Sequence, residues 1–295
     1  MSSRQVEFDP FLFLDTVEGT NDPRCLEILH LQLKRLDPDV ALITRLLSVD
    51  GRNRASQQNE TGSLPLHSAC GNLENLTVEL LNLLLSSYPE SVSHANQFGL
   101  LPLHKAVLKY ENEDSLPSIR KLIELYPEAV RKPTKDGRLP LHMSLSDPKI
   151  TSFKVVQILV DEYPEALQHA DKYGHCPLHK AASKAHIDPG IVGYLLERNE
   201  KIAYLKDNNG WLPLHWALAR DDASIEVLYA LVDVHPGGMY EPDLSGGLPY
   251  DRLMLRAAVE DPELKAAALD VMELAREQIK SRRPKPARVP SPVLR

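Results

Sequence analysis

The sequence predicts an all-α solenoid of stacked helix-turn-helix repeats, with β-turn or hairpin loops between them and helical caps at the ends. Three observations predict it. The tripeptide Pro-Leu-His occurs five times, at 65–67, 102–104, 140–142, 177–179 and 213–215, with successive prolines 36 to 38 residues apart. A degenerate copy, Leu248-Pro249-Tyr250, follows at the same interval. A glycine stands three residues before each of these six prolines, so the period is phased throughout.

Each element of the repeat has a physical reason. Turn residues such as 207–210 come first, and their glycine is free to adopt positive φ. Proline then fits the first turn of a short helix, predicted at 104–109 and 179–185 in two of the copies. A second helix carries apolar residues at helical spacing, as in Val155, Ile158 and Leu159. A Tyr-Pro-Glu marker, present at 88–90, 126–128 and 163–165, ends that helix. Neither helix can bury its apolar face alone, so neighbouring repeats must stack.

The segment Asp207 to Ala217 resembles the ankyrin repeat, whose consensus contains Thr-Pro-Leu-His-x-Ala. The resemblance covers residues 59–250, with repeats starting near 59, 96, 134, 171 and 207 and a degenerate one near 243. The consensus threonine is replaced, and we expect an apolar contact to substitute for its hydroxyl. The replacing residues are Leu64, Leu101, Leu139, Cys176 and Leu212. The repeat is also longer than usual, and we expect the extra residues between the helices, at 111–118, 146–151, 186–190 and 221–224.

The ends of the chain predict three further segments. Residues 1–58 form an N-terminal segment with a helical cap or degenerate repeat, since Leu26, Leu29 and Leu33 keep a helical stripe and a second helix can follow at 40–49. A polar stretch, 50–62, joins this pair to the first clear repeat. Capping helices are expected at 251–280, and a disordered, basic, proline-rich tail at 281–295.

Composition excludes several classes of protein. The stretch 280–295 holds six basic residues and no acidic ones, so the rest of the chain carries −13 against −7 for the whole. An acidic body argues against nucleic-acid binding by the repeats. Three scattered cysteines indicate neither a disulfide framework nor a metal site, and fit a reducing compartment. No signal peptide or membrane span is evident. These features predict a cytoplasmic protein; the basic tail keeps the nucleus open as an alternative.

The five phased histidines predict structure rather than chemistry. Stacked helices lie about 8 to 10 Å apart, whereas ligands around one zinc ion lie within about 4 Å of one another. In the ankyrin repeat, the histidine at this position forms hydrogen bonds within the turn region. His169, His175 and His179 lie close in sequence but lack a cysteine pair. With no nucleophile elbow, phosphate-binding loop or His-Glu-x-x-His motif, we predict no catalytic residue, cofactor or metal. The chain is not expected to be an enzyme.

The resemblance implies a protein-interaction scaffold or adaptor, expected to be monomeric, that binds a protein or peptide through its turn tips and concave face. We predict an aromatic ridge, with packing between repeats as the alternative for each ring. The candidate residues are Phe98, Arg138, Lys172, Tyr173, His175, Asn208, Trp211, Trp216 and Arg220. A second hypothesis is a substrate-recruiting subunit that docks onto an enzyme complex through its tail. The tail itself is open to four interpretations: nuclear-import signal, phosphoinositide patch, phosphorylation site or solubilising end.

Overall fold

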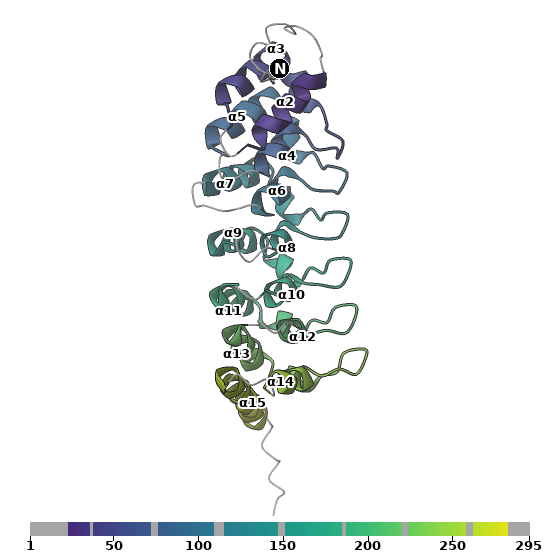
Figure 1. Ribbon diagram of the computed structural model, residues 1–295, viewed down its shortest axis with the longest axis vertical. Coiled ribbons are helices and arrows are strands. Elements are labelled where there is room, and N and C mark those ends of the chain that lie inside the picture. Colours follow the sequence, from purple (N-terminus) through teal and green to yellow (C-terminus); the bar gives the residue numbers. More distant parts are fainter. Residues whose placement is uncertain are drawn as a thin grey trace, which may run out of the picture.

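A computed structural model shows an elongated stack of helix pairs (Figure 1). The structure describes residues 23–35, 38–71, 76–108, 115–146, 151–184, 187–219, 224–257 and 262–282. No strand occurs among them. The predicted all-α solenoid is therefore confirmed.

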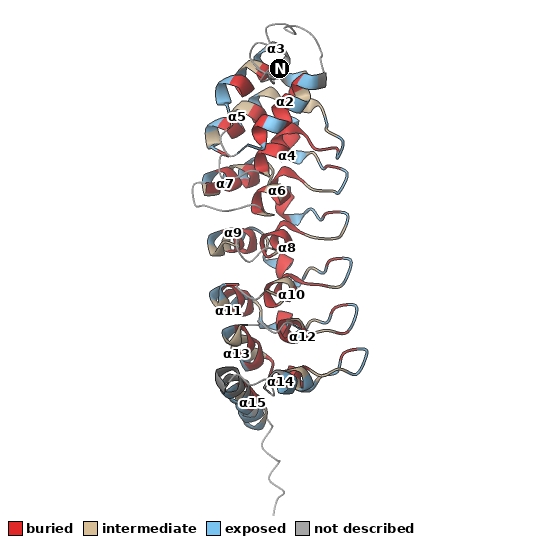
Figure 2. Cartoon of the chain, in the orientation of Figure 1, coloured by how far each residue is buried: buried red, intermediate tan, exposed pale blue. Residues whose placement is uncertain are grey.

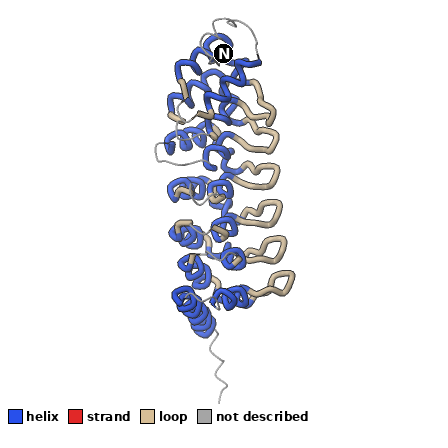
Figure 3. The backbone as a smooth tube through the Cα atoms, in the orientation of Figure 1, coloured by secondary structure: helices blue, strands red, loops and turns tan. Residues whose placement is uncertain are grey.

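Two layers of helices and one row of turns run along the stack (Figures 1 and 3). The first helices of the repeats are α4 (Pro65–Cys70), α6 (Pro102–Leu108), α8 (Pro140–Ser144), α10 (Pro177–Ala182), α12 (Pro213–Leu218) and α14 (Pro249–Ala257). The second helices are α5 (Val78–Ser87), α7 (Leu116–Leu125), α9 (Phe153–Glu162), α11 (Pro189–Arg198), α13 (Ile225–Val234) and α15 (Pro262–Arg282). The turns precede the first helices and project from the side opposite the second helices.

The core is continuous from one repeat to the next. Buried side chains line the inward faces of both helix layers along the stack (Figure 2). Leu64, Leu101, Leu139 and Leu212 are all buried in place of the consensus threonine. Apolar burial therefore replaces the hydroxyl, as the sequence predicts. At the one remaining position of the five, the Cys176 thiol lies 3.0 Å from Nδ1 of His179.

Each second helix from α5 to α13 is followed by a short 3-10 helix that the sequence analysis did not predict. These are η2 (Pro89–Ser93), η4 (Pro127–Arg131), η5 (Pro164–Gln168), η6 (Glu200–Tyr204) and η7 (Pro236–Tyr240). The Tyr-Pro marker does end the α-helix: Tyr88 caps α5 with an extended backbone, and Pro89 then begins η2. Proline at a first helical position starts a new helix as readily as it stops the preceding one.

The N-terminal pair comprises α2 (Pro23–Leu33) and α3 (Val40–Ser56), which pack on α4 and α5 respectively. Asp39 caps α3 by accepting a hydrogen bond from the backbone N–H of Leu42 (2.9 Å). The helix runs seven residues past the predicted end at 49, into a stretch that we had expected to be a linker. Its extension is stabilised because Ala55 is buried and the buried Arg54 guanidinium donates to the carbonyl of Leu46 (2.6 Å).

At the other end α15 packs on α13 and α14, with Val271 and Ala275 fully buried. Ser281 and Arg282 belong to this helix, whereas residues 283–295 of the predicted tail lie outside the described residues. Most of the expected extra length between the helices also lies outside them, at 109–114, 147–150, 185–186 and 220–223. For those residues the predictions stay predictions, but 116–118 and 189–190, also expected between the helices, belong to α7 and α11.

Candidate interaction surface

Six turns precede the first helices, and we number them in chain order: 59–64, 96–101, 134–139, 171–176, 207–212 and 243–248. In the fourth turn, Oδ1 of Asp171 accepts hydrogen bonds from the backbone N–H groups of Tyr173 (2.9 Å) and His175 (3.0 Å). Gly174 has φ 82°, and a Cβ there would lie 2.6 Å from the backbone nitrogen of Asn208. A side chain at this glycine would therefore push the fourth and fifth turns apart.

The turn tips are joined to one another by backbone hydrogen bonds. Each tip donates one N–H to a carbonyl of the preceding tip: Gln97 to Thr61 (3.1 Å), Lys135 to Phe98 (3.0 Å), Lys172 to Asp136 (2.9 Å), Asn208 to Tyr173 (3.1 Å) and Leu244 to Asn209 (3.0 Å). The row of tips is thus a ladder with one bond at each junction. Side chains on neighbouring tips are held at fixed spacing.

The phased histidines connect each turn to the next. In the fourth turn, Nδ1 of His179 accepts from the backbone N–H of Cys176 (3.1 Å), so its Nε2 carries the proton and donates to the carbonyl of Trp211 (3.0 Å). His67, His142 and His215 make the same pair of bonds, and His104 makes the first of them. This is the turn-region role that the ankyrin resemblance implies.

Burial keeps these histidines neutral. Desolvation lowers the pKa of His67, His104, His142 and His179 to about 4, and it also lowers the pKa of His215. Both ring nitrogens of His67, His142, His179 and His215 are occupied by hydrogen bonds, whereas Nε2 of His104 is buried without a partner among the described residues. Among the described residues, no group of three or more His, Cys, Asp or Glu side chains is arranged to hold a metal ion.

Two predicted contact residues stand out on the turn tips. Phe98 and Tyr173 occupy equivalent positions, one residue before the turn glycine, and are 57% and 46% exposed. Lys172 and Asn208 are exposed beside them. Lys172 forms an ion pair with Asp136 across the tips and lies 5.0 Å from the Tyr173 ring centroid. The tips therefore present large rings with charged groups between them.

The two tryptophans lie at different positions relative to the turn glycine from those of Phe98 and Tyr173. Trp211 follows its turn glycine, and the Arg252 guanidinium covers its ring at 4.3 Å. Trp216, on α12, packs edge-on against Trp211 with centroids 5.4 Å apart, and its Nε1 donates to Oδ2 of Asp207 (2.9 Å). Both rings are half-buried. Each tryptophan ring therefore packs against a neighbouring residue on one side and keeps another side partly exposed.

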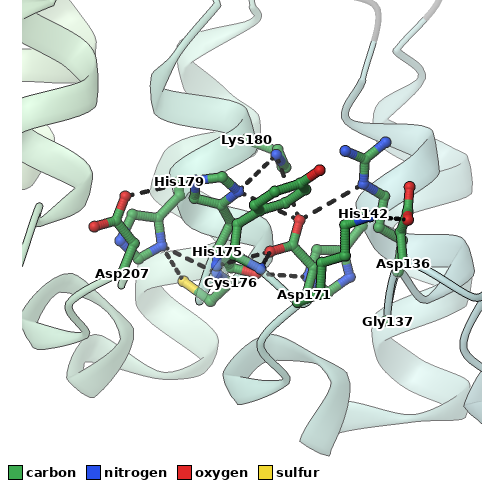
Figure 4. A network of polar contacts seen from close by, with 12 residues as sticks. Asp136, Gly137, His142, Asp171, His175, Cys176, His179, Lys180 and Asp207 are labelled. Carbon is green, nitrogen blue, oxygen red and sulfur yellow. Dashed lines mark hydrogen bonds and ion pairs between the residues drawn. The ribbon is translucent and has the colours of Figure 1, made fainter. Parts of the chain in front are cut away.

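His175 and Arg138 belong to a network of polar groups at the base of the fourth turn (Figure 4). His175 is buried: its Nδ1 accepts a hydrogen bond from the Lys180 ammonium group (2.9 Å), and its Nε2 faces Oδ2 of Asp207 at 3.5 Å. Oδ2 of Asp171 lies 3.6 Å from Nε of Arg138 and 3.5 Å from Nζ of Lys180. His175 therefore lies beneath the candidate surface and makes polar contacts within the protein rather than an exposed contact. Arg220, the remaining predicted residue, lies outside the described residues.

Sequence reasoning missed Lys180 and Asp207 as parts of this network and treated Asp171 only as a turn residue. A signal was present. The first turn residue changes from Asn59, Asn96 and Thr134 to Asp171, Asp207 and Asp243 along the chain. The position three residues after each repeat proline carries Lys180, Trp216 and Arg252 in the same three repeats.

Comparison with known proteins agrees with this architecture. The family model described as "Ankyrin repeats (3 copies)" matches residues 149–237. The crystal structure of the ankyrin repeat domain of Bcl-3, described as a unique member of the IkappaB protein family, superposes with a TM-score of 0.57 at 17% identity. The match covers 84% of this chain and 97% of that one. No curated protein matches the sequence.

The fold and the stacked turns define a helical-repeat solenoid of the class that presents side chains in registered rows. Within that class, residues 149–237 are ankyrin repeats and the stack as a whole has the ankyrin-repeat fold, as the resemblance predicted. Ankyrin repeats as a class mediate protein–protein interaction. The described part of the chain contains no helix long and apolar enough to cross a membrane.

Proposed function

We propose that this protein is a monomeric scaffold or adaptor of the cytoplasm that binds a protein or peptide partner through its turn tips and the adjoining concave face. The observation that carries the proposal is the pair of exposed rings, Phe98 and Tyr173, on a hydrogen-bonded row of tips. Large aromatic side chains supply much of the binding energy of protein interfaces. Exposing them to water costs free energy that a partner would recover.

The geometry supports binding in a second way. Because each tip is bonded to its neighbour, little conformational entropy is lost when a partner orders this surface. Lys172 and Asn208 lie beside Tyr173, and Arg138, Trp211 and Trp216 add polar or half-buried groups on neighbouring turns and on α12. An apolar anchor with a polar rim is the common anatomy of a protein interface. The cytoplasmic assignment rests on three cysteines that are all buried and unpaired.

The test uses the two exposed rings, because Trp211 and Arg138 also contact other repeats. The variant Phe98→Ala/Tyr173→Ala should lower the capture of partners from a cell lysate by about tenfold or more, as expected when two interface aromatics are truncated. Leu125→Ala is the matched control, since Leu125 is 44% exposed but lies at the end of α7, away from the tips. Thermal melting followed by circular dichroism checks that both variants stay folded. If every captured partner is unchanged by the double variant, the proposed surface is wrong.

A further inference from the structure

The base of the fourth turn carries more positive than negative charge. Two cations, Arg138 from the third turn and Lys180 from α10, both face the single carboxylate of Asp171. Lys184 lies two residues beyond the end of α10 and close enough to lower the pKa of Lys180, and among the described residues it has no ion-pair partner. This cluster, Arg138, Lys180 and Lys184 around Asp171, holds three cations and one anion.

The Asp171 carboxylate already has hydrogen-bond partners within the protein and is not exposed to solvent. Oδ1 of Asp171 already accepts two backbone hydrogen bonds, and its side chain has no exposed surface. The cations remain accessible, since the Arg138 and Lys180 side chains are 31% and 19% exposed. At the cluster a molecule therefore meets positive groups first, with the Asp171 charge beneath them, while the exposed Asp136 of the third turn is paired with Lys172.

The cations are only partly neutralised. Burial lowers the pKa of Lys180; Asp171 acts in the opposite sense, while Arg138 and Lys184 lower it further. The Nε of Arg138 is buried and has no hydrogen-bond partner among the described residues, and its contact with Asp171 is longer than a hydrogen bond. An arginine fork and two ammonium groups can still accept an anion.

We infer that the cluster of Arg138, Lys180 and Lys184 receives an acidic, extended segment of the partner protein, with aspartate or glutamate carboxylates opposite the three cations. Charge complementarity is the argument for this occupant. Arg252 over Trp211 extends the positive groups along the same row of turns and first helices, whereas Lys172 at the fourth tip is paired with Asp136. The inference rests on the proposed function, because it names the chemistry of the partner that the scaffold holds.

Two variants move the charge of the cluster in opposite directions. Lys184→Glu changes it from a surplus of two positive charges to none, and should weaken acidic-peptide binding by about fivefold or more, as expected for exposed charge pairs. Asp171→Asn removes the hidden anion and should tighten that binding by a similar factor. The asparagine keeps the turn intact, because Asn96 makes the same two backbone bonds in the second turn. Lys201→Glu, on η6, is the control with the same change in net charge.

The experiment measures fluorescence anisotropy of the full chain with a labelled glutamate-rich peptide, the same peptide with glutamine for glutamate, the same peptide with lysine, and duplex DNA. We expect the glutamate peptide to bind most tightly, to weaken with salt, and to respond to Lys184→Glu and Asp171→Asn but not to Lys201→Glu. A preference for the glutamine or lysine peptide, or DNA binding with the same response to the variants, overturns the inference. So does equal binding by Lys184→Glu and Lys201→Glu.

The acidic-segment inference and the proposed scaffold function can fail separately. If no acidic peptide binds, yet Phe98→Ala/Tyr173→Ala still abolishes partner capture, the scaffold role stands and the acidic-segment inference is wrong. If acidic peptides bind as described while the ring variant leaves capture unchanged, the cluster is a binding site and the tip surface is not.

Discussion

The first three turns and the last three are built on the same backbone, but their first residues differ in charge. In the second turn Asn96 accepts two backbone bonds and donates to the Ser63 hydroxyl (2.9 Å), so the junction is neutral. In the fifth turn Asp207 accepts the same two backbone bonds and adds the Trp216 indole and a contact with His175. A neutral residue is thus sufficient for a turn to form and stack. The carboxylates are an addition, and those of Asp171 and Asp207 bring two cations and an aromatic ring to one part of the surface.

Acid should have the largest effect on stability, because it protonates the phased histidines that both groups of turns share. The folded pKa of about 4 for His67, His104, His142 and His179 lies below the ordinary value of 6.5. Below pH 6.5 the unfolded chain binds more protons than the folded chain, so stability is full above pH 6.5 and is lost as the pH falls towards 4. Each histidine contributes up to about 1.4 kcal/mol per pH unit in this window. Urea unfolding at several pH values measures the slope; a free energy of unfolding that stays flat from pH 6.5 to 4 would contradict it.

The next largest effect should come from Asp207→Ala, which sharpens the comparison at one acidic turn. It leaves two backbone N–H groups and the Trp216 indole N–H without their acceptor in a largely buried site. We expect a loss of about 3 kcal/mol in the free energy of unfolding, measured by urea titration. Asp207→Asn retains an acceptor for the two backbone bonds and should lose about 1 kcal/mol. Equal losses for the two variants would mean that the turn bonds contribute little.

The smallest effect should come from Asn96→Asp, which makes a neutral turn acidic. Asn96 is buried, and its amide donates to Ser63. A carboxylate there loses that donor and is desolvated, so we expect a loss of about 1 kcal/mol at neutral pH, with less at pH 4 where the carboxyl group is protonated more often. Thermal melting at the two pH values measures it. A gain in stability at neutral pH would show that the turns do not differ in their tolerance of charge.

Features whose residues all lie within one repeat could be predicted from the sequence, whereas contacts between two repeats could not. Helix pairs and turn glycines follow from residues a few positions apart, whereas the bonding role of His179 is what the ankyrin resemblance implies. The 3-10 helix that begins at Pro89 was missed because proline was taken only as a stop. The network of Arg138, Asp171 and Lys180 was missed because Arg138 belongs to the preceding repeat. Such a contact becomes visible only when the stacking register is known.

The candidate surface shows the same limit. Phe98 and Tyr173 could be assigned to the tips because their distance from the turn glycine fixes their place. The packing of Trp211 beneath Arg252 required the position of α14, which no local pattern specifies. His175, predicted for the surface, is buried because two carboxylates and Lys180 from neighbouring elements enclose it.

The turn glycines also bear on how long such a stack can be. At Gly174 the following repeat occupies the space that a Cβ would take, whereas at Gly246, which also has positive φ (85°), no atom of the described residues lies within 4 Å of that position. The last turn thus has the shape that elsewhere accepts another repeat, although α15 covers the helices behind it. Stack length is then set by the capping helix and not by the turns. An engineered chain with one more copy of 207–242 inserted ahead of the last turn would keep the junctions on both sides of the insert and add one new junction between the two copies.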